Sequence, residues 1–161
     1  MKKLLIVGAA VLLSSCSGAA RQAKEPVKLP EEFEKNAVVT VGELEYTAEL
    51  HRKGADIWEW EFTQPDTIKG LKLTAAGDSC TMELEGLRVS ADRSKLPEYG
   101  MMPLLDGVLE QLISGKNVSC VAQGKTLLET GTSQGLDYTA RFRDGEVVSV
   151  EIDQALRVKF K

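Results

Sequence analysis

Trp58-Glu59-Trp60-Glu61-Phe62 is the stretch of this sequence that decides the fold. Large aromatic side chains occupy every second position, and glutamates fill the positions between them. Successive side chains of a β-strand point to opposite faces of a sheet, so this alternation predicts a strand with one buried face and one solvent-facing side. The same period recurs on both sides of this stretch, which predicts a mostly antiparallel β fold.

Before this strand, the alternation starts at Val38 and continues through Leu44 to Leu50. We expect these three residues on one buried face, with Glu43 and other charged residues on the opposite face. Gly42 interrupts the run, which predicts either one long bent strand or two strands that meet at a bulge.

After Pro65, the alternation continues through the remaining strands of a first meander. A change of phase at Gly86 predicts a bulge or a change of direction there. The three stretches involved are Leu71–Thr74, Cys80–Leu84 and Leu87–Val89.

The period then changes once, to that of a helix. Pro103 is suited to a first helical position, and Ser114-Gly115 ends the pattern. The apolar residues that recur at spacings of three and four are Leu104, Leu105, Val108, Leu109, Leu112 and Ile113. This spacing predicts one amphipathic helix whose apolar stripe packs against the sheet.

Alternation resumes near Val118 and continues to Phe160, with Asp144-Gly145 as a hairpin signal between two strands. We therefore predict nine or ten antiparallel strands. The predicted fold class is α+β, mostly antiparallel β, with a strongly curved single sheet, an open half-barrel, wrapped around the one amphipathic helix.

The first residues have the three parts of a signal peptide. Lys2 and Lys3 precede an apolar run from Leu4 to Leu13, which is much shorter than the ~20 residues of a membrane-spanning helix. Leu13-Ser14-Ser15-Cys16 resembles the lipobox of bacterial lipoproteins, and this resemblance implies cleavage before Cys16 and lipidation of its thiol. We predict a signal peptide at 1–15, a lipidated cysteine with a flexible tether at 16–32, and a single domain at 33–161.

This targeting places the domain on the extracytoplasmic face of the cell membrane, or on an outer membrane if the host has one. Without Lys2 and Lys3, 18 basic and 24 acidic side chains remain. Nucleic acid is therefore not expected as a partner. Cys80 and Cys120 lie on the apolar phase of their strands, so we expect either a disulfide bridge between them or two separately buried thiols.

Residues suited to catalysis are scarce. His51 is the single histidine, it lies on the polar phase of a strand, and we interpret it as a surface residue. No ligand spacing for zinc, no nucleophile elbow and no phosphate-binding loop occurs in the sequence. We predict that the protein is not an enzyme and has neither a metal nor a cofactor.

The Trp-rich strand running into Gln64-Pro65, the strand order and the helical insertion between two meanders resemble periplasmic lipoprotein carriers of the LolA, LolB and LppX type. The resemblance covers Phe33 to Lys161 at the level of architecture. It implies an open half-barrel whose concave face and helix enclose an apolar cavity. The candidate cavity residues are Trp58, Trp60, Met82, Leu105, Leu109, Leu112 and Tyr138.

Two functions remain open from the sequence. The first is a non-catalytic, membrane-tethered protein that binds a lipid, an acyl chain or another apolar ligand in its concave face. The second is a structural or interaction lipoprotein of the cell envelope, with a filled core and a protein partner that it contacts through a sheet edge or its charged face. Ordinary core packing explains the same aromatic and methionine residues.

Overall fold

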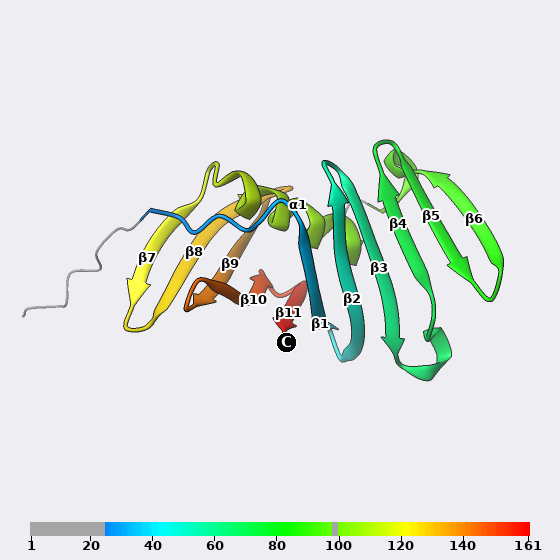
Figure 1. Ribbon diagram of the computed structural model, residues 1–161, viewed down its shortest axis with the longest axis horizontal. Helices are drawn as coiled ribbons and strands as arrows, with labels where there is room; N and C mark the ends of the chain where they lie inside the picture. Colours follow the sequence, from blue (N-terminus) through cyan, green and yellow to red (C-terminus); the bar gives the residue numbers. More distant parts are fainter. Residues whose placement is uncertain (1–24, 98–99) are drawn as a thin grey trace, which may run out of the picture.

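The computed structural model describes residues 25–97 and 100–161. Eleven strands form one antiparallel sheet, and the helix α1 (Met101–Ser114) lies against it (Figure 1). Two short 3₁₀ helices follow β3 and β6, at Asp66–Ile68 (η1) and Arg93–Lys95 (η2). The strands are β1 (Phe33–Val41), β2 (Leu44–Gly54), β3 (Ile57–Gln64), β4 (Lys72–Ala76), β5 (Ser79–Leu84), β6 (Leu87–Asp92), β7 (Ser119–Gln123), β8 (Thr126–Ser133), β9 (Leu136–Arg143), β10 (Glu146–Ile152) and β11 (Leu156–Phe160).

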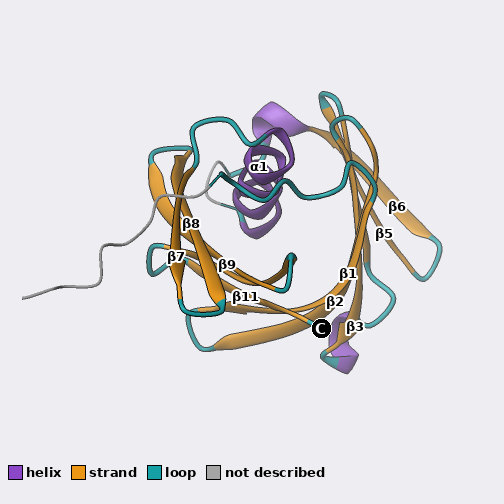
Figure 2. Ribbon diagram, turned by 60° about the vertical axis from the view of Figure 1, so that its left-hand side comes forward, coloured by secondary structure: helices purple, strands orange, loops and turns teal. Residues whose placement is uncertain are grey.

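The strand order places the two meanders side by side. It runs β6-β5-β4-β3-β2-β1-β11-β10-β9-β8-β7, so β1 and β11 join the meanders in the middle and the sheet stays open. Of the two terminal strands, β6 is the last strand before α1 in the chain and β7 is the first after it. The helix therefore links the two edges of the sheet, and Figure 2 shows it between the two halves.

Two predicted irregularities are hairpin turns. At Gly42-Glu43 the chain reverses, and Val41 pairs with Leu44 rather than continuing one strand or forming a bulge. At Glu85-Gly86 both residues have positive φ, 50° and 82°, which is the backbone of a tight two-residue turn. Leu84 and Leu87 are paired across it.

The expected burial was wrong for Val38, because the turn at Gly42-Glu43 changes the phase, and for Leu44, which flanks this turn and is 60% exposed. Opposed residues of antiparallel strands share a face, and the register pairs Ala37 with Ala48 and Val39 with Tyr46. Ala37 and Val39 are accordingly buried, whereas Val38 is only half-buried.

The helix begins two residues earlier than predicted. Met101 is its first residue and Gly100 its N-cap, so Pro103 lies inside the first turn, where its missing N–H removes no helical hydrogen bond. Its end at Ser114 is confirmed. Gly115 follows in the left-handed conformation with φ 65°, and its N–H donates to the carbonyl of Gln111.

The ordered domain begins before Phe33, so the predicted tether is too long at its C-terminal end. Leu29 is buried, and its N–H donates to the carbonyl of Leu112 on α1. The N–H of Val27 donates to Glu129 on β8. Residues 27–29 therefore pack on the domain. The predicted signal peptide, Cys16 and residues 16–24 of the tether lie outside the described residues.

Candidate functional site

The interface between the helix and the sheet is filled with side chains. Six of the seven candidate cavity residues are at most 2% exposed: Trp58 and Trp60 on β3, Leu105, Leu109 and Leu112 on α1, and Tyr138 on β9. They belong to one continuous hydrophobic cluster that joins both meanders and the helix. These residues therefore form the core of the domain.

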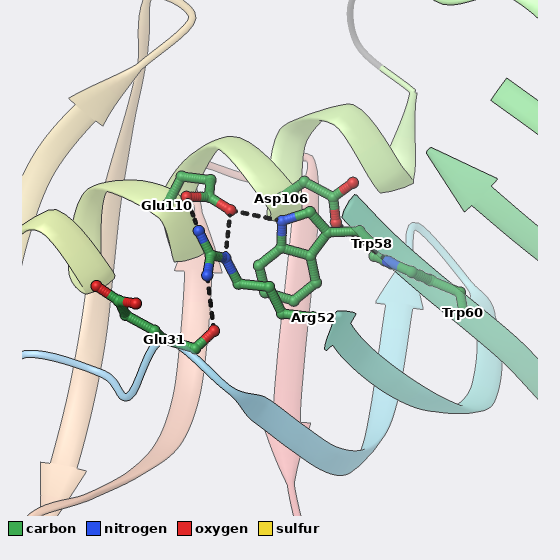
Figure 3. A network of polar contacts seen from close by, with 6 residues as sticks. All are labelled: Glu31, Arg52, Trp58, Trp60, Asp106 and Glu110. Atoms are coloured by element: carbon green, nitrogen blue, oxygen red, sulfur yellow. Dashed lines mark hydrogen bonds and ion pairs between the residues drawn. The ribbon is translucent and has the colours of Figure 1, made fainter. Parts of the chain in front are cut away.

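Polar groups inside this interface connect the helix to β2 and β3 (Figure 3). Glu110 on α1 accepts hydrogen bonds from Arg52 Nε at 2.7 Å and Arg52 Nη2 at 3.1 Å. Its Oε1 also accepts from the indole N–H of Trp58 at 2.8 Å. Arg52 Nη1 donates to the backbone carbonyl of Glu31, so the same guanidinium also holds the N-terminal segment.

Asp106 lies one helical turn before Glu110 and is buried. Its Oδ1 accepts the indole N–H of Trp60 at 3.1 Å, and its Oδ2 has no hydrogen-bond partner among the described residues. Burial raises the pKa of Asp106 from 3.8 to about 8, although the Trp60 hydrogen bond and the charge of Arg93 oppose the shift. This carboxyl group thus keeps its proton near neutral pH.

A second buried acid, Glu129, lies on β8 in the second meander. Glu129 on β8 accepts the N–H of Val27, and burial raises its pKa despite this hydrogen bond. Burial and the charge of Glu129 together raise the pKa of Tyr138 to about 12. The hydroxyl of Tyr138 crosses Gly131, where a Cβ atom would lie 2.7 Å from it. The hydrogen bond from Val27 therefore anchors the N-terminal segment to β8.

Met82, the seventh candidate, is on the surface. It lies on β5, and the register places Trp60, Leu73, Met82 and Val89 in one row across β3, β4, β5 and β6. Opposed residues share a face, so Met82 and Val89 lie on the same face as the core residue Trp60. Met82 is 49% exposed and Val89 65%.

The apolar row continues toward the β5–β6 turn. Leu87 is 77% exposed and opposes the half-buried Leu84. We call the exposed apolar surface of Met82, Leu84, Leu87 and Val89 the apolar arm. It extends the core face of the sheet to the terminal strand β6, all of whose residues are exposed.

The predicted disulfide between Cys80 and Cys120 is not formed. Both residues are buried, as expected, but Cys80 is on β5 and Cys120 on β7. Eight strands separate β5 from β7 in the sheet order. A disulfide needs Cα atoms within about 7 Å, which strands near opposite ends of this sheet do not provide. Burial raises the pKa of the Cys80 thiol, and Asp106 adds to this shift while Arg93 opposes it.

Five depressions of about 300–580 Å³ hollow the surface of the described residues, and Trp58, Trp60 and the helix leucines line none of these five. One of about 300 Å³ reaches Pro103 at the start of α1, and one of about 500 Å³ includes Val27, Leu127 and Phe142 in its lining. Tyr138 contributes to one of about 540 Å³ beside the end of β7.

The face opposite the core carries ion pairs. Lys72 Nζ on β4 lies 3.1 Å from the Glu61 carboxylate on β3. Arg141 and Glu151 pair at 2.9 Å between β9 and β10. His51 lies 3.9 Å from both Glu34 and Glu49, in a solvated setting. Within 25–97 and 100–161, no group of three His, Cys, Asp or Glu side chains is placed to hold a metal ion.

Sequence reasoning missed the buried acids Asp106 and Glu129 and the partly buried pair Arg52 and Glu110. A signal for Asp106 was present, because its spacing of four residues from Met102 and three from Leu109 places it at the edge of the apolar stripe of the helix. Glu129 follows the apolar pair Leu127-Leu128, and nothing in its local pattern separates it from a surface glutamate.

No protein-family model matches the chain, and no curated protein is significantly similar to it. In the part of the chain that the structure describes, no helix has the length and hydropathy needed to cross a membrane.

Proposed function

We propose that this protein is a non-catalytic lipoprotein of the cell envelope, anchored through Cys16, that binds a protein partner with its apolar arm. The observation that carries the proposal is the terminal strand β6. No other strand among the described residues pairs with its outer edge, all of its residues are exposed, and it presents Leu87 and Val89 beside the exposed Met82. Exposed apolar patches and free strand edges are typical of interaction surfaces.

A protein partner explains this surface better than a lipid in the concave face. An acyl chain needs an enclosed apolar cavity, and the residues expected to form one are buried against each other in the core. The edge of β6 instead offers backbone donors and acceptors in a row, which an extended protein segment satisfies and an acyl chain does not.

The half-barrel architecture fits the same role. In this proposal the two meanders and α1 form an open, rigid half-barrel whose filled interior holds β6 at a fixed position outside the membrane. The tether, from Cys16 to the packed residues Val27 and Leu29, sets the reach of the arm from the lipid anchor.

Site-specific photocrosslinking in intact bacteria tests the proposal. A photoreactive amino acid replaces Val89 in the full chain, and a matched variant carries it at Lys159, which is exposed on β11 in the middle of the sheet. We expect a discrete protein adduct from position 89, none from position 159, and loss of the adduct when Leu87→Ser is added. Adducts with lipid alone, or no protein adduct at position 89, would overturn the proposal.

A further inference from the structure

The β5–β6 hairpin determines which backbone groups of β6 face outward. In a hairpin with a two-residue turn, the residues that flank the turn exchange hydrogen bonds, and bonded pairs then alternate along the ladder. Leu84 and Leu87 flank the turn, so Leu87, Val89 and Ala91 bond to β5. The N–H and C=O groups of Arg88, Ser90 and Asp92 therefore point to the free edge.

We infer that the partner bound by β6 is the β6 strand of a second copy of this chain, paired antiparallel about a two-fold axis at Ser90. This inference rests on the proposed function and names its partner. In this register Ser90 opposes Ser90 of the partner subunit, and Arg88 opposes Asp92 of the partner subunit. All outward-facing backbone groups of the three residues then meet a complementary group.

Charge selects this register. Arg88 and Asp92 lie on the same face of β6, two residues to either side of Ser90. Pairing about Ser90 brings each Arg88 next to the partner subunit's Asp92, twice by symmetry. With the axis at Arg88, the two arginines would face each other. With the axis at Val89, each Asp92 would face a residue of the partner subunit's turn. Of these three registers, only the one with its axis at Ser90 is complementary in charge.

The other face of the paired strands is apolar. Val89 then opposes Ala91 of the partner subunit, so the rows from Trp60 to Val89 of the two copies continue into one surface. A two-fold contact also closes on itself and ends at a dimer, whereas pairing β6 with the opposite edge β7 would propagate into a filament.

The membrane anchor favours such a dimer. A pair of six-residue strands forms a small interface, and its affinity in free solution is expected to be low. Tethering both copies to one membrane raises their effective concentration without any new contact. The full, anchored chain is therefore the form in which to test the pairing.

Cysteine cross-linking in intact bacteria measures the register. Ser90→Cys places two thiols opposite each other, with Cα atoms about 5.5 Å apart, within reach of a disulfide. Thr81→Cys is the matched control, because Thr81 is the cross-strand neighbour of Ser90 on the same face of β5. Its two copies would lie three strand spacings apart, about 14 Å, beyond the reach of a disulfide. We expect an oxidised dimer from Ser90→Cys and none above wild type from Thr81→Cys.

Charge exchange tests the pairing of Arg88 with Asp92. Both changes are made in the Ser90→Cys background. Arg88→Glu places an acid opposite Asp92 of the partner subunit, and Asp92→Lys places a base opposite Arg88 of the partner subunit. Each variant alone should lose at least about tenfold of its dimer. Co-expression of the two should restore it, because each new charge then meets its opposite. Fluorescence of the buried Trp58 and Trp60 checks that each variant is folded.

The outcomes separate this inference from the function on which it rests. Equal cross-linking of Ser90→Cys and Thr81→Cys, or no recovery on co-expression, would overturn the dimer. If a photoadduct from position 89 then has a mass other than twice that of the chain, the arm binds a different protein and the proposed function stands. No protein adduct and no cross-link would remove both.

Discussion

Arg52 on β2 and Glu110 on α1 form a bidentate ion pair, in which Arg52 Nε lies 2.7 Å from Glu110 Oε1 and Arg52 Nη2 lies 3.1 Å from Glu110 Oε2. The Arg52 side chain is 8% exposed and that of Glu110 30%, so water screens the pair less than it screens a surface pair. Because Trp58 donates to the same carboxylate, one acid connects the helix to two strands.

Glu110→Ala should therefore lower the free energy of unfolding by about 2–3 kcal/mol, since it leaves the Trp58 indole without its acceptor and Arg52 with only the carbonyl of Glu31. Glu61→Ala is the control. It removes the Lys72–Glu61 pair, whose side chains are 44% and 41% exposed, and should cost less than about 1 kcal/mol. Urea unfolding followed by tryptophan fluorescence measures both. Equal losses in the two variants would contradict a structural role for Glu110.

Asp106 should make stability depend on pH in a defined direction. Its pKa is about 8 in the folded chain against 3.8 ordinarily, so between these values the folded state holds a proton that the unfolded state has lost. The free energy of unfolding then falls as pH rises from about 4 to about 8, by roughly 1.4 kcal/mol for each pH unit where the fall is steepest. Above about pH 8 it levels off.

Asp106→Asn removes this titration and keeps an acceptor for Trp60. The stability of the variant should depend less on pH than that of the wild type. Relative to the wild type, the variant should therefore be more stable at pH 8 than at pH 5. Thermal unfolding across this range provides the measurement. Parallel profiles for the two proteins would show that Asp106 is ionised in the folded state.

The core and the apolar arm should respond differently to loss of an apolar side chain. Leu109→Ala, at a fully buried position of α1, should cost about 2–5 kcal/mol. Val89→Ala, at a position 65% exposed, should change stability by no more than about 0.5 kcal/mol. Chemical denaturation of the two variants decides the matter. A large loss for Val89→Ala would mean that the arm supports the fold rather than a partner.

Gly131 is required by the ring of Tyr138. A Cβ at position 131 would lie 2.7 Å from Tyr138 Oη and 2.9 Å from Cζ, so Gly131→Ala should cost about 1–3 kcal/mol. Gly107→Ala is the comparison, because its Cβ meets only the side-chain ends of Ser133 and Gln134, at 2.9 and 3.2 Å. Alanine also favours the helix there, so the change should stay within about 1 kcal/mol. Equal Tm shifts in the two variants would refute the assigned clash.

The elements of this fold are readable from local patterns. The alternation around Trp58 and Trp60 predicts a strand, and the spacing from Leu104 to Ile113 predicts the helix, because each period reflects the geometry of one element. The break at Gly42 was visible in the sequence, but a two-residue turn differs from a bulge in how the flanking residues pair, which the local pattern does not show. That missed turn is why the burial of Val38 was wrong.

Long-range relations were less accessible. Cys80 and Cys120 share the apolar phase of their strands, yet they lie near opposite ends of the sheet. Glu110 and Glu129 are acids that a local pattern does not distinguish from surface residues, and only packing shows that Glu129 is buried and Glu110 partly buried.

The sequence by itself determined the helix, most of the strands and the division into two meanders, because side-chain periodicity is a property of neighbouring residues. It predicted nine or ten strands, whereas the sheet of the described residues has eleven. Only the tertiary structure decided that β1 pairs with β11, that the core face is filled, and that Met82 and Val89 lie beyond the cover of the helix. The reason is physical. Strand pairing and burial depend on the free energy of packing segments that are distant in the chain, which no local period encodes.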